Sequence, residues 1–147
     1  MDTKKRRDRG FTLIELLIVM VILGLLAALV GPRMFGKVGK SRQRAAKAQI
    51  TLFETALDTY RLDTSQYPTT SQGLEALRSQ PSDVERWDGP YLPKDVPLDP
   101  WGHAYEYRSP GEHGDYDIIS YGADGSQGGE DENMDIVSWR GIEGEEQ

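Results

Sequence analysis

The residues Arg9-Gly10-Phe11-Thr12-Leu13-Ile14-Glu15 open an apolar run that continues to Val30. Residues 11–30 number twenty. As a helix rising ~1.5 Å per residue they would span roughly 30 Å, the thickness of the hydrocarbon core of a bilayer. Glu15 lies one turn inside the run, where a carboxylate costs on the order of a few kcal/mol unless it is paired. The run therefore predicts a membrane-length helix whose acid needs a partner.

The charge of the chain is divided between a basic leader and an acidic remainder. The 147 residues have a formal net charge of −7, and residues 1–10 contribute +3, so the rest carries −10. We expect no nucleic-acid partner, because phosphates require basic contacts. The positive-inside rule keeps the basic leader in the cytoplasm and places the bulk of the chain across the membrane. An ordinary signal peptide is disfavoured, because residues 27–29 match its small-residue cleavage site poorly.

Helical spacing continues beyond the apolar run, and we predict one helix from about residue 12 to residue 62. Its second half is amphipathic, with apolar side chains at helical intervals: Ala46, Ile50, Phe53, Leu57 and Tyr60. Pro32 lacks the N–H that would bond to the carbonyl of Ala28, so a kink is expected there. The alternative is a simple break between an anchor and a separate domain.

The remaining residues predict a small α+β domain. Residues 73–78 are expected to form a short helix capped by Thr70 or Ser71, followed by a long proline-rich loop over residues 81–100. Residues 99–102 are typical of a type I turn, and residues 104–108 and 116–121 of strands. A third strand over residues 91–96 or 136–139 would complete an antiparallel sheet packed on the amphipathic helix.

An acidic, glycine-rich loop over residues 122–135 is the candidate metal site. It holds five carboxylates and four glycines, which suits an oxygen-preferring cation such as calcium. An EF-hand starting at Asp124 matches poorly, and no glycine-rich repeat recurs. Composition alone leaves a metal site and a solvated acidic turn about equal.

Catalysis is not expected. His103 and His113 are the only histidines, each beside a glycine in a turn-like stretch, and no nucleophile motif or metal-type histidine pair accompanies them. Paired carboxylates for hydrolysis would need a firmer platform than a glycine-rich loop. Both histidines are therefore interpreted as surface residues.

The motif over residues 10–15 resembles the processing site of type IV pilins and of the pseudopilins of type II secretion systems. The resemblance implies that a prepilin peptidase in the membrane cuts between Gly10 and Phe11 and N-methylates Phe11. It implies that Glu15 is the assembly glutamate, which pairs with the Phe11 amine of a neighbouring subunit. It also implies a helix bend at Pro32.

The residues after the helix resemble the major pseudopilin. Residues 67–77 are similar to its sequence, and Gly122-Ala123-Asp124-Gly125 with Asp135-Ile136 and Trp139 is similar to its calcium loop. The resemblance implies Ca²⁺ as cofactor, with Asp124 as one ligand, Asp131 as the expected second aspartate, Asp135 as its rival, and the carbonyl of Tyr121. The chain has no cysteine, so a metal would take the place of the disulfide that usually closes the C-terminal region of type IV pilins.

The resemblance implies a type IV pilin-like fold and a structural role. Residues 1–10 would be the removed leader, 11–31 the transmembrane and filament-core helix, and 32–147 a periplasmic domain that includes the amphipathic helix 32–62. The product would be the periplasmic pseudopilus, which helps to move folded exoproteins through an outer-membrane secretin. Expected partners are further copies of the chain, minor pseudopilins, the prepilin peptidase, and the inner-membrane assembly platform with its ATPase. Two alternatives remain: a type IV pilus pilin, and a signal-anchored periplasmic enzyme or binding protein.

Overall fold

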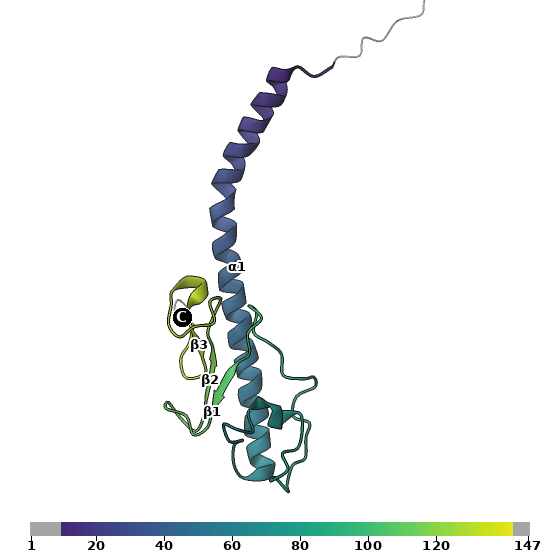
Figure 1. Ribbon diagram of the computed structural model, residues 1–147, viewed down its shortest axis with the longest axis vertical. Helices are drawn as coiled ribbons and strands as arrows, with labels where there is room; N and C mark the ends of the chain where they lie inside the picture. Colours follow the sequence, from purple (N-terminus) through teal and green to yellow (C-terminus); the bar gives the residue numbers. More distant parts are fainter. Residues whose placement is uncertain (1–9, 143–147) are drawn as a thin grey trace, which may run out of the picture. The chain divides into compact units, whose positions relative to one another are not determined.

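The structure is a computed structural model that describes residues 10–142, apart from the side chains of residues 32–36 (Figure 1). A single long helix precedes two short 3₁₀ turns and three strands, which confirms the predicted α+β class. The elements are, in order, α1 (Leu13–Thr64), η1 (Leu74–Leu77), β1 (Glu106–Arg108), β2 (Asp117–Ser120), η2 (Asp131–Asn133) and β3 (Ile136–Val137). The chain divides into two compact units after Lys37.

The first unit contains the apolar part of α1. Residues Leu13–Gly31 are long and apolar enough to cross a membrane, and none of this stretch is buried within the chain. The helix continues through Gly31 and Pro32, so this dipeptide does not end it. The side chain of Pro32 lies outside the described residues, and the kink there stays a prediction.

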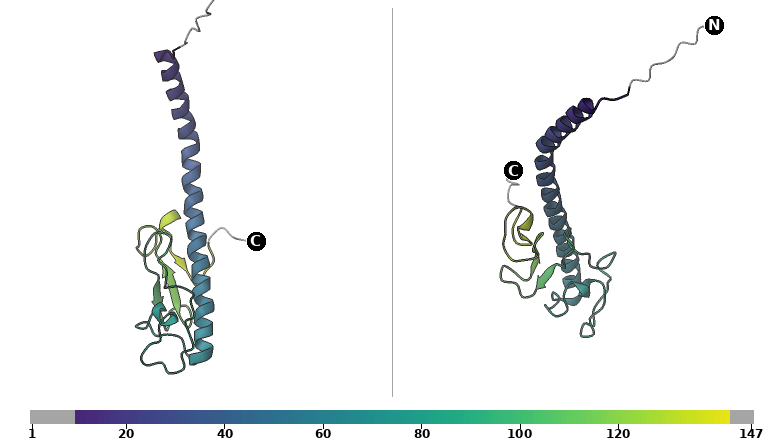
Figure 2. Two further views of the ribbon diagram at one scale, coloured as in Figure 1. Left: turned by 90° about the vertical axis from the view of Figure 1, so that its right-hand side faces the viewer. Right: turned by 45° about the horizontal axis from the view of Figure 1, so that its top comes forward.

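The second unit is built on the rest of α1, along which the strands lie (Figure 2). The predicted apolar face is confirmed: Ile50, Phe53, Leu57 and Tyr60 are completely buried. Side chains at this 3.6-residue spacing share one side of the helix, which here meets the sheet and the long loop. Tyr105 contacts Phe53 edge-to-face, with 5.1 Å between the ring centroids, so aromatic side chains fill much of this core.

The sheet has the order β1-β2-β3, and both pairs are antiparallel. Tyr107 pairs with Ile118, and Ser120 pairs with Ile136. All three strands are shorter than the predicted segments. Of the two candidates for the third strand, residues 136–139 are right and residues 91–96 are wrong. Because β2 is central, its four residues are all buried.

The predicted cap of the second helix is wrong. The element is a single 3₁₀ turn, η1, and it begins after Gly73, whose φ of 62° lies in the left-handed region that glycine tolerates best. No side chain caps it. The Thr70 hydroxyl instead donates to the Ser109 carbonyl at 3.1 Å and accepts the Ser109 N–H at 2.9 Å, which joins this segment to the turn after β1.

Candidate functional site: the processing motif and the acidic loop

The start of α1 carries a reciprocal cap that the sequence analysis missed. The Thr12 N–H donates to Oε2 of Glu15 at 2.8 Å, and the Glu15 N–H donates to the Thr12 hydroxyl at 3.3 Å. This is a capping box, in which the N–H groups of the N-cap residue and of the residue three positions later are satisfied by side chains. Its signature, a hydroxyl residue three positions before a glutamate and ahead of an apolar run, is visible in the printed sequence.

The capping box changes how Glu15 should be understood. Its carboxylate is not wholly unpaired in the isolated chain, because one oxygen accepts the Thr12 N–H. The other oxygen remains for a second donor. Both partners of the box follow Gly10, so cleavage after Gly10 would leave the box intact.

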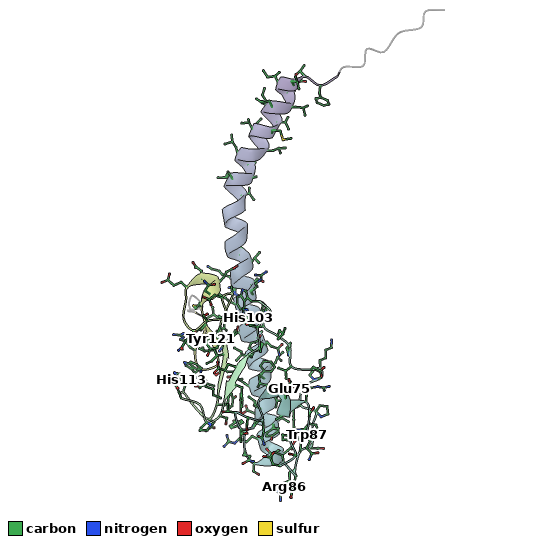
Figure 3. All side chains as sticks on the ribbon, in the orientation of Figure 1. Glu75, Arg86, Trp87, His103, His113 and Tyr121 are labelled. Atoms are coloured by element: carbon green, nitrogen blue, oxygen red, sulfur yellow. The ribbon has the colours of Figure 1, made fainter. Side chains whose placement is uncertain are left out.

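Two aspartates of the acidic loop accept hydrogen bonds from the loop's own backbone (Figure 3 shows Tyr121 and His103 nearby). Asp124 is exposed, and its Oδ1 accepts the Ser126 N–H at 3.0 Å. Asp135 is half-buried, and its Oδ2 accepts the Gly128 N–H at 2.9 Å. Its Oδ1 is buried and finds no hydrogen-bond partner among the described residues. A buried carboxylate oxygen without a donor is unfavourable, and a bound cation would satisfy it.

Asp131 has a different environment from Asp135. It lies at the start of η2 with an exposed side chain and a φ of 51°. Its carbonyl oxygen accepts a hydrogen bond from the Gln43 side chain of α1. In this arrangement the backbone of Asp131 holds the loop to the helix, while its carboxylate faces solvent.

Glycine permits η2 to lie close to the rest of the domain at two positions. Gly122 has a φ of 62°, and a Cβ there would lie 2.8 Å from the Glu132 carbonyl oxygen. Gly39 of α1 faces the Glu132 side chain, whose Cγ would lie 2.7 Å from an added Cβ. The Ala123 N–H donates to the Glu132 carbonyl at 2.8 Å, so the two ends of the loop are joined directly.

His103 contacts the first residues of the acidic loop, and Tyr121 directly precedes the loop. His103 Nδ1 lies 3.0 Å from the Gly122 carbonyl oxygen, and its ring lies against Gly125. The Tyr121 hydroxyl donates to Glu106 at 2.5 Å, and this bond, with help from Arg108, lowers the pKa of Glu106. The interpretation of His103 as an ordinary surface residue is therefore wrong, because it is half-buried and positions the loop.

The described residues contain no group of three or more histidine, cysteine or acidic side chains placed to hold a metal. Calcium also accepts backbone carbonyls, so two carboxylates with carbonyl oxygens suffice in principle. The unpartnered Oδ1 of Asp135 is the oxygen among the described residues that fits a cation ligand in this loop. Asp124 lies in the same loop and Tyr121 directly precedes it, whereas the carboxylate of Asp131 is exposed.

Three further polar side chains that the sequence did not point to hold the domain together. Asp99 Oδ2 accepts the Ser120 hydroxyl at 2.6 Å, and Asp117, only 1% exposed, accepts the Glu112 N–H at 2.8 Å. Lys47 donates to the carbonyls of residues 137, 138 and 140 at 2.8, 3.1 and 3.0 Å. Burial lowers the pKa of Lys47, and Glu54 opposes this effect.

A long helix with a membrane-length apolar half, a charged N-terminal motif and a small antiparallel sheet define a type IV pilin-like subunit. The family described as "Type II secretion system (T2SS), protein G" matches residues 33–139, and the "Prokaryotic N-terminal methylation motif" matches residues 5–31. The chain belongs to the type II secretion system protein G family, whose members are structural pseudopilins. The pilus pilin alternative is not favoured.

Relatives and a solved structure agree over most of the chain. The type II secretion system core protein G of Vibrio cholerae is 48% identical, with 92% of this chain and 94% of the relative covered. That of Pseudomonas aeruginosa is 44% identical, with 92% and 98% covered. The crystal structure of the major pseudopilin from the type 2 secretion system of enterohaemorrhagic Escherichia coli is similar with a TM-score of 0.61 and 40% identity. The matched region covers 74% of this chain and 95% of the pseudopilin chain in that crystal structure.

Proposed function

We propose that the chain is the major subunit of a periplasmic pseudopilus and polymerises to help push folded exoproteins through the outer-membrane secretin. The observation that supports this proposal most directly is the apolar half of α1, from Leu13 to Gly31. None of it is buried within the chain. An apolar helix surface of this size needs lipid or neighbouring helices around it. Lipid surrounds this surface in the membrane and the helices of other copies surround it in the filament, so the surface is kept from water in both states.

The capping box gives the assembly step a local geometry. After cleavage between Gly10 and Phe11, the N-methylated amine of Phe11 carries a positive charge. Glu15 Oε2 stays on the Thr12 N–H, and Oε1 accepts the Phe11 amine of an adjacent subunit. Such a contact joins different surfaces of two copies and does not close, which produces a helical filament.

The unassembled subunit is proposed to span the inner membrane once, with its C-terminal domain in the periplasm. The basic leader then lies in the cytoplasm, where the prepilin peptidase and the ATPase-driven assembly platform act on the subunit. Minor pseudopilins and exoproteins would contact the assembled filament. The subunit itself has no catalytic role in this scheme.

Calcium is proposed to bind the acidic loop through Asp124, Asp135 and the Tyr121 carbonyl. The unpartnered buried oxygen of Asp135 supports this choice over Asp131. When bound, the ion would neutralise the repulsion between the loop carboxylates. The loop's own contacts with Gln43 and Gly39 would transmit its order to α1.

The first test is mass spectrometry of the mature N-terminus from cells that contain the secretion system. The expected chain begins at Phe11 and carries one N-methyl group. A mature chain that begins elsewhere, as a signal-anchored enzyme or binding protein would, contradicts the proposal.

The second test separates pairing from capping at Glu15. Glu15→Leu should insert and be processed but should fail to form filaments, because it removes the partner of the Phe11 amine. Thr12→Val removes the hydroxyl that caps the Glu15 N–H and keeps both the carboxylate and the backbone N–H that donates to it, so it should still assemble. Normal filaments from Glu15→Leu would remove the pairing argument, and loss of filaments in both variants would make the helix cap, and not the charge pair, the common cause.

A further inference from the structure

The first turns of α1 in the second compact unit are held by one short element. This unit begins at Val38, and of residues 38–45 only Gly39 and Gln43 are buried. The next buried residue along the helix is Ala46, which already belongs to the hydrophobic core of the domain. The contacts of Gly39 and Gln43 therefore decide whether the domain holds residues 38–45 at all.

Both residues are covered by η2 of the acidic loop, which lies beside α1 and is drawn in yellow-green in Figure 1. The Gln43 side-chain amide donates to the carbonyl oxygen of Asp131, and Gln43 is only 6% exposed. The Glu132 side chain lies over Gly39, where an added Cβ would be 2.7 Å from its Cγ and 2.8 Å from its Oε1. Any larger residue at position 39 would displace Glu132. We call these two contacts, Gln43 with Asp131 and Gly39 with Glu132, the clasp.

The clasp is also fixed on the side that faces the sheet. The Ala123 N–H donates to the Glu132 carbonyl at 2.8 Å, which joins η2 to the residues that follow β2. Asp131 has a φ of 51°, a conformation that is uncommon for residues other than glycine and is kept where neighbouring contacts hold it. The element η2 is therefore a bridge between α1 and the end of the central strand.

Two parts of the helix within the domain differ in how firmly they are held. From Ile50 to Tyr60, completely buried apolar side chains fix α1 to the sheet and the long loop. Residues 38–45 have only the hydrogen bond of Gln43 and the covered Gly39. Because local opening is easiest where few apolar contacts are buried, residues 38–45 are the part of this helix that opens first.

We propose that the clasp makes Gly39 the first residue of α1 that the domain holds, and that its release frees the helix as far as Ala46. The apolar span ends at Gly31, so the linker along the chain would grow from the seven residues 32–38 to the fourteen residues 32–45. As helix, at ~1.5 Å per residue, the added part measures about 10 Å.

This inference deepens the proposed function and rests on it. In the filament, the apolar span packs among other helices while the domain stays attached through its own α1. The length of the linker limits how far the domain can move from the span when a subunit leaves the membrane. The clasp would set that length.

The test is amide hydrogen exchange, followed by mass spectrometry, on the full chain in detergent micelles with calcium chloride in excess. Gln43→Ala/Glu132→Ala removes both contacts of the clasp. Alanine is the better helix former at position 43, so a loss of protection there cannot come from helix propensity. The amides of residues 40–45 should exchange at least about fivefold faster than in the wild type, the factor that corresponds to the ~1 kcal/mol of one lost hydrogen bond. Residues 53–60 should keep their exchange rates, because their buried contacts are unchanged.

Two control variants keep the clasp and should exchange like the wild type. Arg42→Ala/Glu130→Ala truncates two exposed side chains next to the clasp. Asp131→Asn keeps the carbonyl that accepts the Gln43 amide, and asparagine tolerates the left-handed backbone at this position.

Three results would overturn the inference. Unchanged exchange of residues 40–45 in Gln43→Ala/Glu132→Ala would show that the clasp does not hold them. Equally fast exchange in either control would show that the effect does not come from the two contacts. Faster exchange that extends to residues 53–60 would show that these side chains support the whole domain and not its first turns.

Failure of the proposed function is distinguishable from failure of the clasp. The mature N-terminus and the filaments report on that function, whereas exchange within the domain reports on the clasp alone. A chelator tests the calcium site separately. If the exchange of the wild-type acidic loop did not respond to it, the metal would be contradicted, and the difference between the clasp variant and its controls would stand.

Discussion

The two halves of α1 obey the same helical geometry but differ in what surrounds them. In the first half, from Leu13 to Val30, the large apolar side chains are about half exposed or more, and they point in every direction around the axis. In the second half, the buried apolar side chains recur on one face, where Ile50, Phe53 and Leu57 are completely buried. The second half has its partner within the chain, whereas the first half requires one from outside.

One helix therefore contributes to two separate processes, folding of the domain and insertion or assembly of the subunit. The domain's free energy of unfolding depends on the amphipathic half, because only that half exchanges water for protein on folding of the chain. The apolar half contributes to insertion and assembly instead. Substitutions should therefore separate cleanly according to the half in which they fall.

The sharpest separation is expected between Phe53→Ala and Leu17→Ala. Phe53 is fully buried against Tyr105, so its truncation should destabilise the domain by about 3–5 kcal/mol. Leu17 is exposed within the chain, so its truncation should change the domain's stability by less than about 0.5 kcal/mol. Denaturant unfolding followed by tryptophan fluorescence measures both. Similar losses in the two variants would break the distinction between the halves.

Calcium should stabilise only the half of α1 that the acidic loop contacts. At a hundredfold excess over its dissociation constant, the ion should raise the free energy of unfolding by about 2.7 kcal/mol. Asp135→Asn should abolish this gain and Asp131→Asn should preserve it, as measured by thermal melting with calcium and with a chelator. If calcium left the melting curve of the wild-type protein unchanged, the proposed calcium site would be contradicted.

Lys47 sharpens the comparison because it joins the amphipathic half to the chain after β3. Lys47→Met keeps the aliphatic stem and removes the donors to three carbonyls, which should cost about 1–3 kcal/mol. Lys40→Met is the control, since Lys40 is exposed on the same helix and its loss should cost less than about 0.5 kcal/mol. Equal effects would mean that helix propensity, and not the carbonyl contacts, accounts for the loss.

The smallest effect concerns acid stability of the sheet that the amphipathic half packs against. The Tyr121 hydroxyl and then Arg108 hold the pKa of Glu106 below its ordinary value of 4.5. A group with a lowered pKa contributes stability above its unfolded value and loses it as the pH falls through the folded value. The melting temperature of Glu106→Gln should therefore decline less than that of the wild type as the pH falls below 4.5. A parallel decline in both would show that other carboxylates dominate.

Several parts of the fold and site could be predicted because their signals are local. The apolar run, the buried face of Ile50, Phe53 and Leu57, and the strand around Tyr107 all follow from spacing along a single element. The capping box of Thr12 and Glu15 is equally local, but the position of Glu15 inside an apolar run points first to a membrane carboxylate and hides its role as a cap. The predicted strand ends and the predicted cap of η1 are wrong. Short turns depend on contacts between distant residues, such as the hydrogen bond from the Ser109 N–H to the Thr70 hydroxyl.

The sequence by itself determined that this chain has a membrane-length helix, a processing motif and an amphipathic continuation, because hydrophobic period and charge order are properties of neighbouring residues. Three contacts depend on the folded chain: Lys47 donates to carbonyls about ninety positions away, Gln43 donates to the Asp131 carbonyl, and Asp135 keeps an unpartnered oxygen. These contacts join distant segments, and their geometry depends on how the backbone of one is carried to the other.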